Sequence, residues 1–249
     1  MILPMIRAIA FDFGGTLFST AKMGTFTPLM TDAFLTGVTQ ELKCPQERAV
    51  QIFEAYTKAW KSRRARGGDL PEREVSSLDL LRSALFEVGA KLTKDQMQEI
   101  LNAFHSEESE QFTPLQHVIE SLPRLAEKGY RLCVVSNNPW SESIRACFRR
   151  HKIESFFEQI IVSCDVGFRK PHRQIFEELL KQLSLPATEI LFVGDSFTHD
   201  SEMPKKLGMK TCLVDFEGSN KNGQKERAQD ADLFLTRFNE LVPSISTFG

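Results

Sequence analysis

The sequence lacks three features that mark special classes of protein: an excess of charge of one sign, closely spaced cysteines and a long apolar run. Its 249 residues carry 31 basic and 33 acidic side chains, a formal net charge of −2. This balance argues against a nucleic-acid-binding surface and against a polybasic membrane contact. No apolar run approaches the length of about 20 residues that spans a bilayer. We therefore expect a protein that binds neither nucleic acid nor membrane.

The five cysteines are scattered, without the C-x-x-C spacing that is typical of metal and redox sites. Three of them lie in apolar runs, so we expect reduced thiols that pack in the interior. The opening stretch MILPMIRAIAF is short and has no small-residue cleavage site, and it predicts a strand instead of a signal peptide. Together these features predict a cytoplasmic protein.

Short apolar runs alternate with helical patterns along most of the chain, and neither an internal repeat nor a low-complexity segment is present. The runs that we expect to be strands are IRAIAFDF, YRLCVVSN, EQIIVSC, EILFVGD, KTCLVDF and ADLFL. The helical patterns between the later runs cover residues 115–128, 141–151, 172–183 and 201–207. This alternation predicts an α/β fold with a doubly wound parallel sheet.

The stretch from residue 20 to 112 differs, because it contains no comparable strand run. Its helical patterns predict four helices, at about 27–43, 46–64, 71–89 and 94–108. We interpret this stretch as a helical cap domain, 20–112, inserted into a core domain made of residues 1–19 and 113–249. Near the other end of the chain, SNKNGQKE at 219–226 predicts a solvated loop.

Polar residues stand directly after the apolar runs. They are Asp12, Ser136, Asn137 and Asp195. In a parallel sheet these positions are the carboxyl ends of the strands, where open α/β sheets bind their ligands. Lys170 precedes a helical pattern that we expect Pro171 to start. The sequence thus brings carboxylates, a hydroxyl and a primary amine to one edge of the predicted sheet.

These residue types suit phosphoryl transfer. A carboxylate can attack phosphorus and form an aspartyl-phosphate. Two carboxylates and a backbone carbonyl are the hard oxygen ligands that Mg²⁺ prefers, and the metal and a lysine neutralise charge on the phosphoryl oxygens. Taken singly, a strand-end aspartate is often only a helix N-cap, and a lone lysine is usually a surface charge. The joint placement carries the prediction.

Four segments, FDFGGTL, VVSNN, RKP with its following helix, and FVGDSFTHD, resemble in order and spacing the four motifs of the haloacid dehalogenase (HAD) superfamily of hydrolases. The resemblance covers residues 6–19 and about 114–238. It implies a Rossmann-like core with a helical cap inserted after the first motif, which agrees with the insertion inferred above. It also implies a Mg²⁺ cofactor and a small phosphorylated or otherwise anionic substrate.

The resemblance further implies roles for the motif residues in catalysis and in phosphate binding. Asp12 would be the nucleophile, and Lys170 would stabilise the charge of the phosphoryl group. Thr16 would support the first-motif loop at the phosphate site. Ser136 and Asn137 would hold the phosphoryl group.

The same resemblance implies a metal site. Its ligands would be the Asp12 carboxylate, the backbone carbonyl of Gly14 and the Asp195 carboxylate. Asp200 would be a further ligand or would orient the waters on the metal.

The first motif departs from the pattern of the phosphatases in the superfamily, which carry a second aspartate two residues after the nucleophile as general acid and base. Gly14 occupies that position here. General acid catalysis contributes roughly 10²–10⁴ in rate, so the absence of this aspartate would slow the reaction greatly without abolishing it. His199 stands where asparagine is more usual, either as a replacement proton carrier or as a loop residue with a local hydrogen bond.

Three interpretations follow, and the first is preferred. The first is a Mg²⁺-dependent phosphatase that uses Asp12. The second is a non-catalytic protein that binds a phosphate or a partner. The third is a 2-haloacid dehalogenase, whose relatives also lack the second aspartate and need no metal. Two residues count against this third interpretation: Asp195 keeps the acidic fourth motif, and Phe176 stands where the dehalogenases have tyrosine.

A basic cluster in the cap, within KAWKSRRARGGDLPERE at 58–74, offers a possible substrate contact. Arg63, Arg64 or Arg66 could clamp an anionic substrate tail. The alternative is a solvated helix end at which cations are favourably placed. The sequence leaves the substrate and the oligomeric state open.

Overall fold

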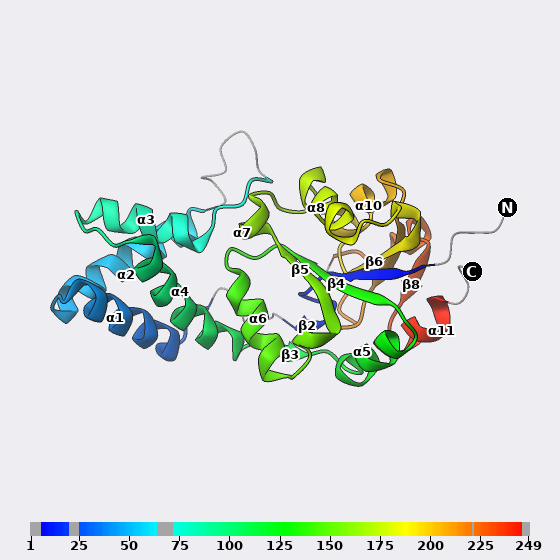
Figure 1. The fold of residues 1–249 in the computed structure, drawn as a ribbon, viewed down its shortest axis with the longest axis horizontal. Coiled ribbons are helices and arrows are strands. Elements are labelled where there is room, and N and C mark those ends of the chain that lie inside the picture. The colour runs from blue at the N-terminus through cyan, green and yellow to red at the C-terminus, as the bar shows by residue number, and fades with distance from the viewer. Residues whose placement is uncertain (1–5, 20–24, 64–71, 221, 246–249) are drawn as a thin grey trace.

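The computed structural model describes residues 6–19, 25–63, 72–220 and 222–245. Two packed parts lie side by side along the long axis of the molecule (Figure 1). One part is a parallel sheet with helices on both faces, and the other is a group of four helices.

Six parallel strands form the sheet, in the order β5-β4-β1-β6-β7-β8. Their bounds are Ala8–Phe11 (β1), Arg131–Ser136 (β4), Phe157–Val162 (β5), Ile190–Gly194 (β6), Lys210–Val214 (β7) and Leu233–Leu235 (β8). Each strand lies in one of the six apolar runs, so the predicted α/β architecture is confirmed. The chain moves outward from β1 to β5 and then returns to place β6 on the other side of β1. This reversal is the switch point at which such sheets bind ligands.

Helices cover both faces of the sheet. The helices on one face are α5 (Val118–Glu127), α6 (Ser141–Arg150) and α11 (Leu241–Ile245), and those on the other are α8 (Arg173–Leu183) and α10 (Glu202–Lys206). Along β1, Ile9 and Phe11 pack toward the first group, whereas Ala8 and Ala10 pack toward the second. All four side chains are fully buried. Burial on two faces explains why this strand has an apolar run instead of an alternating pattern.

Two details of the helices differ from the sequence-based expectation. Pro171 does not start α8, because the helix begins at Arg173 and His172 is its N-cap, with its side chain accepting the N–H of Gln174. The fourth motif forms a short helix of its own, α9 (Phe197–Asp200), ahead of α10. Another short helix, α7 (Ser163–Val166), follows β5.

Four helices form the cap, between β2 (Phe18–Ser19) and β3 (Thr113–Pro114). They are α1 (Pro28–Leu42), α2 (Gln46–Lys61), α3 (Ser77–Glu87) and α4 (Lys94–Ser109). The four predicted helices are thus confirmed, although α3 begins later than expected. Because β2 and β3 pair with each other, the chain leaves the core and re-enters it at adjacent points. The limits of the cap domain, residues 20 and 112, stay a prediction.

The cap has a hydrophobic core separate from the two that flank the sheet. Phe34, Tyr56 and Phe104 lie at its centre, fully buried. The ring of Phe104 meets the other two at centroid distances of 5.8 and 5.7 Å, edge to face in both cases. Aromatic packing of this kind adds about 0.5–1.5 kcal/mol per pair to the free energy gained by burial.

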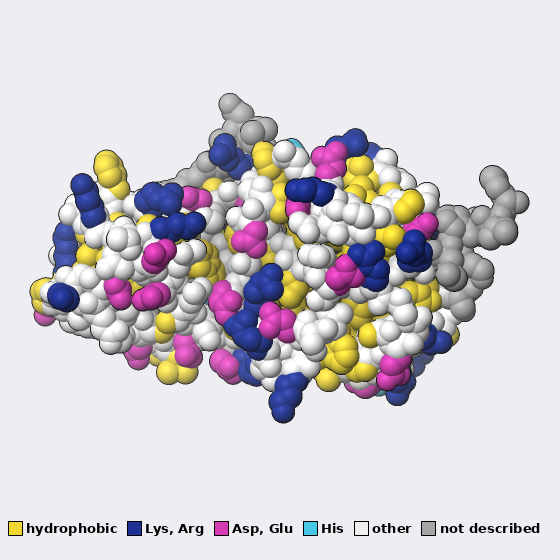
Figure 2. Space-filling model, in the orientation of Figure 1, with side chains coloured by type: hydrophobic (Ala, Val, Ile, Leu, Met, Phe, Trp, Pro, Cys, Tyr) yellow, Lys and Arg dark blue, Asp and Glu magenta, His cyan; other side chains and the backbone are white. Residues whose placement is uncertain are grey.

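No described helix combines the length and the apolar character needed to cross a membrane. The face shown in Figure 2 carries lysine and arginine side chains interspersed with aspartate and glutamate. This distribution agrees with the small net charge of the sequence.

The packing of the cap predicts that Phe104→Ala lowers the free energy of unfolding by about 3–5 kcal/mol, because it leaves a cavity among rings that cannot close over it. Phe86→Ala is the matched control, since Phe86 lies on α3 with 87% of its surface exposed. We expect the control to change stability by no more than about 0.5 kcal/mol. Urea denaturation of both variants measures the difference, and equal losses would contradict a separate cap core.

Candidate active site

A hollow of about 180 Å³ lies at the carboxyl ends of β1, β4 and β6. It is lined by Asp12, Phe13, Gly14, Ser136, Asn137, Asn138, Lys170, Asp195, Ser196, His199 and Asp200. Eight residues that the sequence singled out are therefore brought together here: Asp12, Gly14, Ser136, Asn137, Lys170, Asp195, His199 and Asp200. The described parts of the cap contribute no lining residue.

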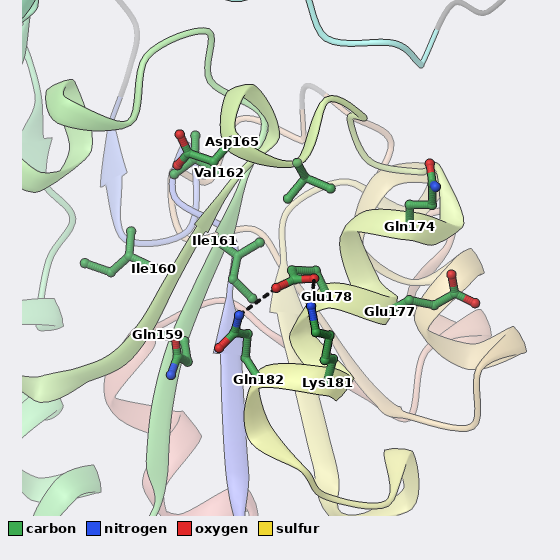
Figure 3. Close-up of a pocket in the computed structure, with 11 residues that line it drawn as sticks. Gln159, Ile160, Ile161, Val162, Asp165, Gln174, Glu177, Glu178, Lys181 and Gln182 are labelled. Atoms are coloured by element: carbon green, nitrogen blue, oxygen red, sulfur yellow. Dashed lines mark hydrogen bonds and ion pairs between the residues drawn. The ribbon is translucent and has the colours of Figure 1, made fainter.

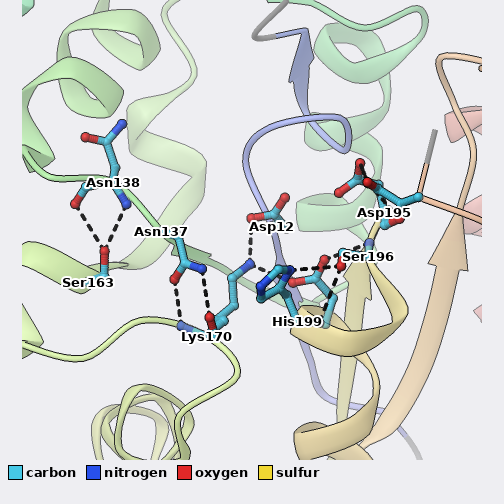
Figure 4. Close-up of polar contacts among 10 residues, drawn as sticks. Asp12, Asn137, Asn138, Ser163, Lys170, Asp195, Ser196 and His199 are labelled. Carbon is cyan, nitrogen blue, oxygen red and sulfur yellow. Dashed lines mark hydrogen bonds and ion pairs between the residues drawn. The ribbon is translucent and has the colours of Figure 1, made fainter. Parts of the chain in front are cut away.

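The ammonium group of Lys170 lies between two carboxylates (Figure 4). It donates to Asp12 Oδ1 at 2.6 Å and to Asp200 Oδ1 at 2.7 Å. All three residues are buried, and Lys170 is only 3% exposed. Charges this deep in a protein are stable only when they are paired and hydrogen-bonded. The lysine therefore has a fixed position in the site.

The backbone of Lys170 is held as firmly as its side chain. The Lys170 N–H donates to Asn137 Oδ1 at 2.7 Å, and Asn137 Nδ2 donates to the Lys170 carbonyl at 3.0 Å. Asn137 directly follows β4, so the sheet itself fixes this residue. Through Asn137, the end of β4 determines the position of the loop that carries Lys170.

The site shifts the pKa values of its charged groups. Burial raises the pKa of Asp12 to about 6; the Lys170 ammonium opposes this rise and the Asp200 carboxylate adds to it. Burial acts to lower the pKa of Lys170, but Asp12 and Asp200 outweigh it and leave the pKa above its ordinary value. Lys170 is therefore a cation in this site.

Three buried carboxylates fit a divalent cation. Asp12, Asp195 and Asp200 each offer an oxygen within 4.8 Å of the others, and they are the hard ligands that Mg²⁺ binds. Lys170 supplies a single positive charge among them. Both oxygens of Asp200 already accept hydrogen bonds, from Lys170 and from the Ser196 N–H at 3.0 Å. These two hydrogen bonds indicate that Asp200 serves to orient Lys170 more than to bind a metal.

Two glycines allow the carboxylates to approach the backbone closely. A Cβ atom at Gly15 would lie 2.4 Å from Asp195 Oδ2, and one at Gly194 would lie 2.3 Å from Asp200 Cγ. Gly15 also has a φ of 77°, which side-chain-bearing residues rarely adopt. Gly14 does not share this positive φ. The second glycine of the motif is thus required by the fold, whereas the first does not have a positive φ.

His199 of the fourth motif and Thr16 of the first motif differ from one another in their relation to the hollow. His199 lines the hollow, and its Nδ1 lies 2.9 Å from Ser196 Oγ, so the expected local hydrogen bond is confirmed. Thr16 is fully buried and does not line the hollow, and its Oγ1 has no hydrogen-bond partner among the described residues. A phosphate contact of Thr16 and a proton-carrier role of His199 stay predictions.

The sequence did not indicate Asn222. Its Nδ2 donates to Asp195 Oδ2 at 2.8 Å, so it helps to hold a predicted metal ligand. Gln224 in the same stretch is buried, but most of the described residues of 219–226 are exposed and none lies in a helix or strand, so the expected solvated loop is confirmed except at Gln224. One signal was available, since this stretch follows β7 at the same edge of the sheet as the other site residues.

Two of the three arginines of the predicted clamp, Arg64 and Arg66, lie outside the described residues. Arg63 stacks on the ring of Trp60 at 4.1 Å and donates to the Trp60 carbonyl at 3.2 Å, and it does not line the hollow. Its place just beyond α2 agrees with the alternative of a cation at a helix end, and a substrate contact stays a prediction.

A larger hollow, of about 560 Å³, lies between the edge strand β5 and α8 (Figure 3). Three of its polar side chains pair with one another, since Glu178 accepts from Gln182 at 2.6 Å and from Lys181 at 3.5 Å. None of the predicted site residues lines it. The smaller hollow, with its buried charges, is the candidate active site.

The geometry at Gly15 predicts that Gly15→Ala destabilises the protein more than Gly89→Ala. Both residues have a positive φ, of 77° and 66°, so both variants lose roughly 1 kcal/mol from backbone strain. Only the Gly15 variant also pushes a methyl group onto Asp195, because a Cβ at Gly89 meets nothing within 4 Å. We expect a further loss of about 1–3 kcal/mol in the free energy of unfolding, measured by denaturant titration. Equal losses would show that the Asp195 contact is not close.

Comparisons with known proteins agree with this site. The sequence pattern of the family described as haloacid dehalogenase-like hydrolase matches residues 68–214, more than half of the chain, including Ser136, Lys170 and Asp195. A glyceraldehyde 3-phosphate phosphatase of Methanocaldococcus jannaschii is 25% identical over 242 residues, which cover 96% of each chain.

Two solved structures have the same fold. A Bacillus subtilis HAD-hydrolase bound to magnesium is 18% identical and has a TM-score of 0.55, over 97% of this chain and 99% of its own. A 2-haloacid dehalogenase of Pseudomonas syringae is 21% identical and has a TM-score of 0.60, over 98% and 99% of the two chains. With its motif residues assembled at the sheet edge and its sequence matched to the family over more than half its length, the chain belongs to the haloacid dehalogenase-like hydrolases and is a HAD-type hydrolase.

Proposed function

We propose that the protein is a Mg²⁺-dependent phosphoric-monoester hydrolase that acts through an aspartyl-phosphate on Asp12. The observation that carries the proposal is the pairing of Asp12 with Lys170 at 2.6 Å, in a hollow that also contains Asp195. A relative that aligns over nearly the whole chain bears the name of a phosphatase, which supports phosphate esters as the substrate class.

The reaction has two steps at Asp12. A carboxylate oxygen of Asp12 attacks phosphorus and the P–O bond to the leaving group breaks. The leaving group departs with the bond's electron pair as an alkoxide or phenoxide, which then takes a proton from solvent water. Water then attacks the phosphorus of the aspartyl-phosphate, which releases inorganic phosphate and restores the carboxylate. Lys170 assists both steps, because its ammonium can neutralise charge on the phosphoryl oxygens while it holds Asp12 in place.

Asp12, the carbonyl of Gly14 and Asp195 would hold Mg²⁺. When bound, the cation supplies positive charge to a phosphoryl oxygen and offsets the repulsion between the carboxylate and the phosphate. Asn222, which donates to Asp195 Oδ2, would orient that ligand.

Ser136 and Asn137 would bind the phosphoryl group from the end of β4. Ser136 lines the hollow and is 4% exposed, so its hydroxyl belongs to the interior of the site. The amide side chain of Asn137 is engaged with the Lys170 backbone, and we therefore expect its backbone N–H to be the group that meets phosphate.

The substrate would be small. The hollow of about 180 Å³ is below the range of about 300–1,000 Å³ that is usual for drug-sized ligands. It suits a phosphoryl group with a few further atoms, in agreement with the small phosphorylated substrate expected from the sequence.

Asp12→Asn is expected to lower turnover of an aryl phosphate by about 10³-fold or more, since the amide is a poor nucleophile of nearly the same shape. The side chain can still meet Lys170 through its carbonyl oxygen, so we expect the fold to persist. Steady-state kinetics and circular dichroism measure the two effects. Normal turnover by a folded Asp12→Asn protein would exclude Asp12 as the nucleophile.

The glycine at position 14 predicts that the rate falls steeply as the basicity of the leaving group rises. Without a general acid, an alkoxide leaves poorly, whereas an aryl or acyl phosphate needs no proton. Gly14→Asp should flatten the dependence and gain up to about 10²-fold on alkyl phosphates. Gly14 does not have the positive φ that would oppose this substitution. The measurement is a leaving-group series for both proteins, and a flat series in the native protein would mean that another group already donates the proton.

A single screen separates the three interpretations of the sequence. Phosphate release and halide release are assayed side by side, with Mg²⁺ and with a chelator. We expect phosphate release that the chelator stops. Halide release that survives chelation would establish the dehalogenase, and the absence of both products would favour the non-catalytic alternative.

A further inference from the structure

A segment of the cap pairs with the loop that leads to Lys170. The Glu74 N–H donates to the Gly167 carbonyl at 3.0 Å, and the Arg169 N–H donates to the Glu72 carbonyl at 2.6 Å. Arg73 and Phe168 form an antiparallel bridge between these two bonds. Figure 1 shows the coil that leads into α3 running toward α7 and the core.

The Glu74 side chain is buried in this junction, with 2% of its surface exposed. The Ser163 hydroxyl donates to Glu74 Oε2, and the Val75 N–H donates to Oε1 at 3.1 Å. Arg169 Nη1 lies 3.9 Å from Oε1. Glu74 is thus a cap carboxylate whose partners belong largely to the core.

Ser163 transmits this contact to the active site. Its Oγ accepts the Asn138 N–H at 2.9 Å and lies 3.1 Å from the Asn138 carbonyl oxygen. A hydroxyl has one proton, and the charged Glu74 oxygen is the stronger of its two acceptors. When the Ser163 hydroxyl donates to Glu74 Oε2, its oxygen is still free to accept the Asn138 N–H. The loop after β4 is therefore anchored through Ser163 to the cap.

Glu74 holds two loops, the Gly167–Arg169 loop directly and the Asn138 loop through Ser163, and these two loops hold Lys170. One carries Asn137, whose amide binds the Lys170 backbone on both sides, and the other ends at Arg169, next to Lys170. A displacement of about 1 Å at a reacting group can cost about 10²-fold in rate. The position of this lysine is consequently sensitive to both loops.

We propose that Glu74 is a positioning residue of the active site, which couples the cap to Lys170 by holding the Asn138 loop and the Gly167–Arg169 loop against one another. The effect on catalysis rests on the proposed phosphatase function, whereas the effect on the two loops does not. The cap can then separate from the core only if the Glu74 contacts break. That break would release the loop that carries Lys170.

Amide hydrogen exchange in the unliganded protein tests the coupling without any substrate. Glu74→Ala should speed exchange at the Asn138 and Arg169 amides by about 10-fold or more, as expected from the loss of a charge-assisted hydrogen bond. Glu74→Gln keeps an oxygen acceptor for Ser163 and should restore most of the protection. Glu72→Ala is the matched control, because Glu72 contacts Arg169 through its backbone carbonyl.

Kinetics test the positioning role. Glu74→Ala should lower kcat on an aryl phosphate by roughly 10- to 100-fold, with a smaller change in KM, and Glu74→Gln should recover most of the loss. Wild-type exchange at both amides in folded Glu74→Ala would overturn the coupling. Faster exchange with unchanged kcat would overturn the positioning role.

Ser163→Ala breaks the same contact from the core side, and it decides the question if Glu74→Ala does not fold. It should speed exchange at the Asn138 amide and lower kcat in the same way, and wild-type values of both would overturn the proposal. If the wild-type protein hydrolyses no phosphate ester, the proposed function fails, and the exchange measurement alone decides the coupling.

Discussion

The ion pairs of Lys170 with Asp12 and Asp200 are the constraint on which the site depends. A buried ammonium between two buried carboxylates cannot be moved without leaving a charge unpaired, and such a loss is strongly destabilising. The rest of the local structure serves this arrangement. Asn137 holds the lysine backbone, and Gly194 leaves room for Asp200 beside the end of β6.

The same arrangement explains why the site could bind a divalent cation. Lys170 compensates only part of the charge of three carboxylates whose oxygens lie within 4.8 Å of one another. Burial and the Asp200 carboxylate raise the pKa of Asp12, and Asp12 would have to be ionised to act as the proposed nucleophile. A divalent cation held by these carboxylates would balance the remaining charge and favour the ionised form of Asp12.

The sequence predicts the parts of the site that are fixed by the ends of strands. Asp12, Ser136 and Asp195 follow apolar runs, and parallel pairing must bring such ends together. It does not predict contacts made by side chains that meet only after folding. Asn222 reaches Asp195 from a polar loop, and Glu74 reaches Ser163 from the cap, and neither pairing has a local pattern in the sequence.

Trapping of the phosphoenzyme is the most direct test of the account. The protein is mixed with an aryl phosphate and Mg²⁺, quenched in acid and digested, and the phosphoryl group is located by mass spectrometry. The account predicts a phosphoryl group on Asp12 when Mg²⁺ is present and none after chelation. Turnover with the phosphoryl group on another residue, or unaffected labelling of Asp12 in the presence of a chelator, would contradict it.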